Sequence, residues 1–159
     1  MLDDRTAARL RQGLRVAQII WAMMLAALAV YVAFPRLMAG QTTDALSGPP
    51  ADPMQRYAFM ALGMILLLAL PIIRRKIIGA PPGRSSGKSP DAGPLLARYL
   101  RGVVISLALA EAVAVLGLVL YLRGETAQVL YIFTAASAAA MFAYRPRWAE
   151  LEELARGPN

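Results

Sequence analysis

The chain has 159 residues, of which 58% are hydrophobic and 17% charged, and its mean hydropathy is +0.49. This composition is too apolar for an ordinary soluble domain and predicts one all-α, polytopic membrane domain. The sequence contains no cysteine and no histidine, which excludes disulfides and thiolate chemistry and removes the usual haem ligand and the standard general base. We therefore expect no cofactor, no metal site and no enzymatic activity.

Four apolar segments are long enough to cross a hydrocarbon core of about 30 Å as helices. They cover residues 16–34, 57–73, 102–122 and 127–144. We expect four transmembrane helices that pack as two antiparallel hairpins, within a membrane domain of residues 16–147. Residues 1–15 and 148–159 then form the terminal segments.

The distribution of Lys and Arg predicts the orientation of these spans. Of the 17 basic residues, Arg36, Arg56 and Arg123 fall in the first and third connections, and all the others fall in the N-terminal segment, the middle loop or the C-terminal tail. By the positive-inside rule both termini and the middle loop are cytoplasmic, in a membrane of the bacterial inner-membrane type. Since topology accounts for most of the net charge of +7, we expect no nucleic-acid partner.

Residues 79–94 are rich in Gly, Pro and Ser and are typical of a flexible cytoplasmic linker. Within this linker, the segment from Gly83 to Ser89 reads GRSSGKS and is similar to a phosphate-binding loop. The phosphate loop requires four residues between its first Gly and its Gly-Lys pair, whereas three are present here, and no strand precedes the segment. We therefore expect no nucleotide site.

Residues 123–126 leave room for only a tight turn between the third and fourth segments, which predicts an antiparallel pair of helices. The third segment carries small residues, Ala110, Ala114 and Gly117, which favour close helix packing.

Glu111 is the only ionisable residue between Gly102 and Leu122 and lies near the centre of that stretch. A charged side chain at the middle of a bilayer costs about 2.5–3.5 kcal/mol even on lenient insertion scales, so the expected ground state is a neutral, hydrogen-bonded carboxyl group. Reflecting the sequence about the tight turn places Ser137 near the depth of Glu111 and Thr134 one turn away. Either hydroxyl could hydrogen-bond to the carboxyl group.

The stretch from Ala108 to Leu122, ALAEAVAVLGLVLYL, resembles the ion-carrying helix of the rotor-ring proteolipids (c/K subunits) of F-type and V-type ATPases. In those proteins a glutamate flanked by small residues and followed by a Gly-Leu pair binds a proton or a sodium ion. The resemblance implies that Glu111 matches that carboxylate and that Gly117 and Leu118 match the downstream pair. As a whole the chain also resembles uncharacterised bacterial four-span membrane proteins, a likeness that implies no activity.

Two functions remain open from the sequence. The first is a non-enzymatic subunit or accessory factor of a larger membrane assembly, in which Glu111 is a buried hydrogen-bonding anchor between spans or toward another subunit. The second is a proton- or cation-coupled, proteolipid-like or carrier protein in which Glu111 is the titrating site. Both imply the lipid bilayer and other membrane subunits, or self-association, as partners.

Overall fold

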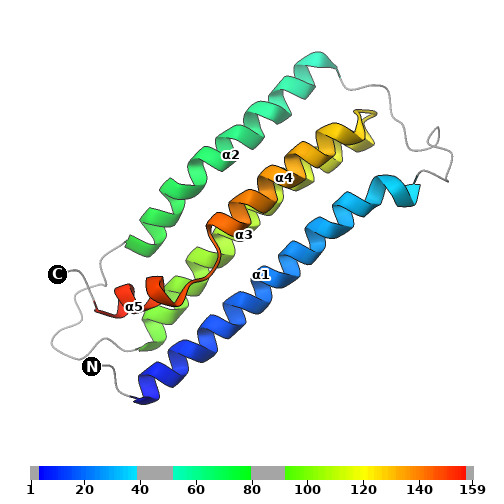
Figure 1. Ribbon diagram of the computed structural model, residues 1–159. Coiled ribbons are helices and arrows are strands. Elements are labelled where there is room, and N and C mark those ends of the chain that lie inside the picture. Colours follow the sequence, from blue (N-terminus) through cyan, green and yellow to red (C-terminus); the bar gives the residue numbers. More distant parts are fainter. Residues whose placement is uncertain (1–3, 39–51, 80–91, 157–159) are drawn as a thin grey trace.

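The computed structural model describes residues 4–38, 52–79 and 92–156, and these residues form five helices and no strand. The helices, shown in Figure 1, are α1 (Asp4–Met38), α2 (Pro53–Gly79), α3 (Ala92–Leu122), α4 (Ala127–Ala143) and α5 (Trp148–Arg156). The all-helical prediction is confirmed for this part of the chain.

Three of these helices are long and apolar enough to cross a membrane. The qualifying stretches are Ala8–Met38, Pro53–Ile77 and Leu95–Leu122, with mean hydropathies of 2.1, 2.0 and 2.6. A fourth helix, α4, is apolar but has only 17 residues. Most of α1 and α2 is exposed in the isolated chain, including Ile19, Met23, Met64 and Leu68, as expected for helices that face lipid.

The helices extend beyond the predicted spans. α1 begins at Asp4, so residues 4–15 are helical and continuous with the first predicted span. α2 continues to Gly79, and α3 already begins at Ala92 because Pro94 is tolerated in the first turn of a helix. Residues 79 and 92–94 of the predicted linker are therefore helical, and its central part, residues 80–91, lies outside the described residues.

α3 and α4 form an antiparallel pair at the centre of the bundle. α1 packs against both of them, and α2 packs against α3 on the other side (Figure 1). α1 and α2 therefore lie on opposite sides of this pair, and the prediction that they form a hairpin of their own is wrong. The first connection is long enough to let its two helices separate, whereas the turn after α3 is not.

The turn between α3 and α4 depends on Gly124, whose φ of 87° lies in the left-handed region that favours glycine. The amide of Glu125 donates to the carbonyl of Leu120 over 3.1 Å, which closes the end of α3. Farther along the pair, Gly117 lets the two backbones approach closely. A Cβ atom placed on Gly117 would lie 2.5 Å from the Cβ of Phe133.

α5 folds back over one end of the bundle and contributes Leu151 to the core. This side chain is fully buried and joins the same apolar cluster as Leu10, Tyr99 and Met141. Arg74, near the end of α2, fixes this arrangement. Its guanidinium donates to the Tyr144 carbonyl over 2.9 Å and to the Glu150 carboxylate over 2.6 Å.

Candidate functional site

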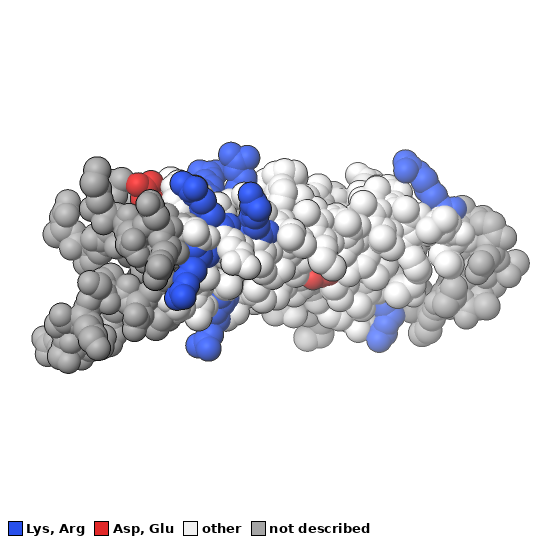
Figure 2. All heavy atoms as spheres, turned by 90° about the horizontal axis from the view of Figure 1, so that it is seen from below, with Lys and Arg blue, Asp and Glu red and all other residues white. Residues whose placement is uncertain are grey.

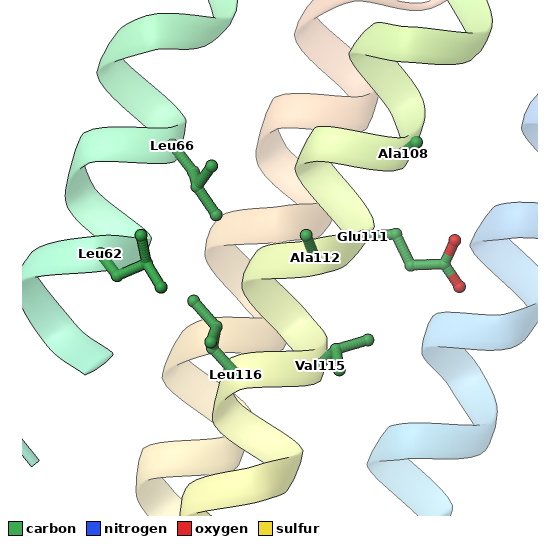
Figure 3. Close-up of a pocket in the computed structure, with 7 residues that line it drawn as sticks. All are labelled: Leu62, Leu66, Ala108, Glu111, Ala112, Val115 and Leu116. Carbon is green, nitrogen blue, oxygen red and sulfur yellow. The ribbon is translucent and has the colours of Figure 1, made fainter. Parts of the chain in front are cut away.

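Glu111 lies in the middle of α3 and is half-buried. Figure 3 shows its side chain extending toward α1, while Leu116 on the same helix extends the opposite way, toward α2. The hydroxyl of Tyr31, on α1, donates to Oε1 of Glu111 over 3.4 Å. This distance is longer than the usual 2.7–2.8 Å or so for such a bond, so the contact is a weak one.

The two hydroxyls that the sequence places near Glu111 bond to the backbone instead. Ser137 donates to the carbonyl of Ala110 over 2.6 Å, and Thr134 donates to the carbonyl of Leu130 over 2.8 Å. Ser137 thus lies at the predicted depth, because the residue that it contacts, Ala110, directly precedes Glu111 on α3. Neither hydroxyl donates to the carboxyl group, in contrast to the prediction from the sequence.

The reason for this difference is that α4, which carries Ser137, packs against a different face of α3 from the one that carries Glu111. Ala110 and Ala114 are fully buried, and α4 covers the face of α3 that carries the Ala110 carbonyl and Gly117. Glu111 follows Ala110 by one residue, which corresponds to a rotation of about 100° around the helix axis. The carboxyl group therefore points toward α1.

Tyr31 is the functional candidate that reasoning from the sequence missed. Within an apolar run a tyrosine is easily read as one more hydrophobic residue, and no tight turn fixes the depth of α1 relative to α3. A polar tip in the interior of a span is the signal that could have identified it, because a buried phenol usually finds a hydrogen-bond partner.

A hollow of about 420 Å³ lies beside Glu111 on the side of α3 that faces away from α4. Figure 3 shows its lining, which comes from α2 and α3 and in which Glu111 is the one polar residue. The lining residues are Leu62, Leu66, Ala108, Glu111, Ala112, Val115 and Leu116.

Charged contacts occur toward the two ends of the bundle. The face in Figure 2 carries Lys and Arg side chains toward both ends and, between them, a belt of uncharged residues in which an acidic side chain reaches the surface. The ion pairs identified among the described residues, Arg56 with Glu125 at 3.6 Å and Arg74 with Glu150 at 2.6 Å, involve helix ends. Within the described ranges no cation pairs with Glu111, and no group of three acidic side chains could hold a metal ion.

The chemistry available to this site is that of a carboxyl group in an apolar setting. When neutral, it offers one donor and acceptor capacity on both oxygens, and only Oε1 has a partner, Tyr31, among the described residues. Comparison of the chain with models of protein families, with curated proteins and with solved structures found no match. The function must therefore be argued from these residues.

Proposed function

We propose that the chain is a four-span integral membrane protein that serves, without enzymatic activity, as a subunit or accessory factor of a larger membrane assembly. Glu111 is its intramembrane hydrogen-bonding anchor. The observation that carries this proposal is a carboxyl group at the middle of an apolar helix, half-buried, with one long contact to Tyr31 and an open hollow beside it. Lipid tails cannot hydrogen-bond, so a polar group of this kind is best satisfied by a neighbouring protein.

The pairing of α3 with α4 supports a fourth span. The Ser137–Ala110 hydrogen bond and the Gly117–Phe133 approach place α4 alongside the apolar part of α3. At 1.5 Å per residue its 17 residues extend about 25 Å, close to the thickness of the hydrocarbon core. With four crossings and the basic residues on the inner side, both termini are cytoplasmic in a membrane of the bacterial inner-membrane type. Reporter fusions at each terminus test this topology.

The anchor role predicts how two variants differ. Glu111→Gln keeps a donor and an acceptor at the same position, whereas Glu111→Ala removes both. The tagged chain is purified from its native membrane in mild detergent, and the membrane proteins that co-purify are quantified. We expect the Gln variant to retain them and the Ala variant to lose them.

Glu125→Gln is the matched control, because Glu125 is an acid at the end of the bundle that pairs with Arg56 and has no place at the hollow. Its complex should match that of the unaltered chain. Equal recovery of partners with Glu111→Ala and with the unaltered chain would refute the anchor role.

The second candidate function is ion coupling, in which Glu111 gains and loses a proton or cation. The hollow favours it, because Glu111 is one of the residues that line it. If this function is correct, Glu111→Gln keeps the assembly intact but abolishes ion movement across the membrane of proteoliposomes that contain the assembly. Labelling of Glu111 by dicyclohexylcarbodiimide, which reacts with protonated carboxyl groups in apolar surroundings, would support the same reading.

A further inference from the structure

We infer that a phospholipid with an anionic head group binds where α1 runs beside the junction of α4 and α5. Figure 2 shows Lys and Arg side chains gathered toward this end of the bundle, at the left. The inference does not involve Glu111, but it rests on the proposed topology, which puts this end at the negatively charged inner surface of a bilayer. We call the surface the basic seam, and it consists of Arg11, Arg15, Trp21, Phe142, Arg145 and Trp148.

Two contacts join the sides of the basic seam, one at each of its ends. At the end nearer the membrane core, the indole of Trp21 donates to the carbonyl of Met141 over 3.0 Å, and its ring meets that of Phe142 edge-on at a centroid distance of 5.5 Å. At the other end, the guanidinium of Arg11 lies 6.0 Å from the centre of the Trp148 ring. Between these contacts, α1 and the chain that leads from α4 into α5 therefore run antiparallel along each other.

Two arginines lie between these contacts, one on each side of the seam. Arg15 is an exposed residue of α1, and Arg145 is an exposed residue whose amide donates to the Phe142 carbonyl over 3.4 Å. The ion pairs found among the described residues include neither of them. In α5, the carboxylate of Glu150 pairs with Arg74 of α2, a helix on the other side of the α3–α4 pair. The two guanidinium groups of the seam are therefore available to an anion from outside the chain.

The order of side chains along the seam matches the order of groups in a phospholipid. Phe142 is 52% exposed and, with Trp21, lies inside the predicted spans, where it offers apolar surface to an acyl chain. Arg15 lies about 9 Å farther out along α1, at the level of the head groups. Guanidinium groups bind phosphate through paired hydrogen bonds, and two of them favour a lipid with net negative charge over a zwitterionic one. A soluble anion would gain nothing from the exposed phenylalanine.

The fluorescence of tryptophan can report on this lipid, because the two tryptophans of the chain, Trp21 and Trp148, both belong to the seam. The full chain is reconstituted in bilayers of equal parts phosphatidylcholine and phosphatidylglycerol. In one sample the first lipid carries brominated acyl chains, which quench tryptophan at close range, and in the other sample the second lipid carries them. The surface charge is the same in both samples, so the difference in quenching measures which lipid is enriched at the seam.

A pair of double variants separates the seam from the general charge of this end. Arg15→Gln with Arg145→Gln removes two cations from the seam. Arg75→Gln with Lys76→Gln is the matched control, because it removes two exposed cations from α2 at the same end of the bundle. None of these four side chains is buried, so both variants should fold, and far-ultraviolet circular dichroism checks that they do.

We expect the unaltered chain to prefer phosphatidylglycerol roughly five- to thirtyfold at the seam. The seam variant should lower this preference to within about twofold of unity, whereas the α2 variant should retain it. No preference in the unaltered chain, or an equal loss in both variants, would overturn the inference. Inorganic phosphate at constant ionic strength should leave the quenching unchanged, and release of the lipid by phosphate would show a site for a soluble anion instead. The reporter fusions test the topology separately, so its failure is distinguishable from failure of the lipid site.

Discussion

The contacts of Arg74 predict that α5 opens when this one side chain is removed. Arg74 is 6% exposed, and its guanidinium donates both to the carbonyl of Tyr144, the C-cap residue of α4, and to the Glu150 carboxylate of α5. A hydrogen bond that involves a charged group contributes about 1.5–3 kcal/mol. The Glu150 side chain is 40% exposed, so solvent screens that pair and its share is discounted to about 1 kcal/mol or less. We therefore expect Arg74→Met to weaken the attachment of α5 by roughly 2–3 kcal/mol.

This change can be measured as the accessibility of a thiol at position 151. Leu151 is a residue of α5 and is fully buried, so Leu151→Cys should react slowly with a maleimide, at a rate set by the fraction of molecules in which α5 is open. Because every 1.4 kcal/mol or so is a factor of ten, adding Arg74→Met should raise that rate roughly 30- to 140-fold. Arg75→Met is the control, since Arg75 is exposed and adjacent. An unchanged rate with Arg74→Met, or an equal rise with Arg75→Met, would refute this account of how α5 is held.

Two further predictions concern the α3–α4 pair. Gly117→Ala should lower the free energy of unfolding by about 1–3 kcal/mol, because the new methyl group meets the Cβ of Phe133. Gly93→Ala, where nothing lies within 4 Å, should not lower it. Ser137→Ala should cost about 0.6–1.7 kcal/mol through loss of the bond to the Ala110 carbonyl. All three are measured by denaturant titration in the same detergent, and a Gly117→Ala effect no larger than that of Gly93→Ala would contradict the close approach.

The long apolar helices could be predicted from hydropathy because lipid leaves the backbone few alternatives to a helix. The arrangement of the α3–α4 pair was also predictable, since a tight turn fixes relative depth and brought Ser137 to the level of Ala110, next to Glu111. The direction of the Glu111 side chain and the identity of its partner could not be predicted, because they depend on helix rotation and on the long connections between helices. The rotation of α3 points the Glu111 carboxyl group toward α1. The predicted first span has its midpoint near Leu25, but α1 is shifted along its axis, so that Tyr31 lies beside Glu111 instead.

The contacts of Glu111 also predict that it contributes little to the fold of a single copy. Its contact with Tyr31 is long, and it takes no part in the contacts that join α3 to α4. A leucine at position 111 would avoid the cost of inserting a polar group into lipid. Glu111→Leu should therefore leave the free energy of unfolding of the monomer in detergent unchanged or raise it, while lowering the recovery of the membrane proteins that co-purify with the chain. If Glu111→Leu lowered the free energy of unfolding of the monomer as much as Gly117→Ala does, the carboxyl group would be stabilising the fold of a single copy. An anchor for a neighbouring subunit is not required for the stability of its own bundle.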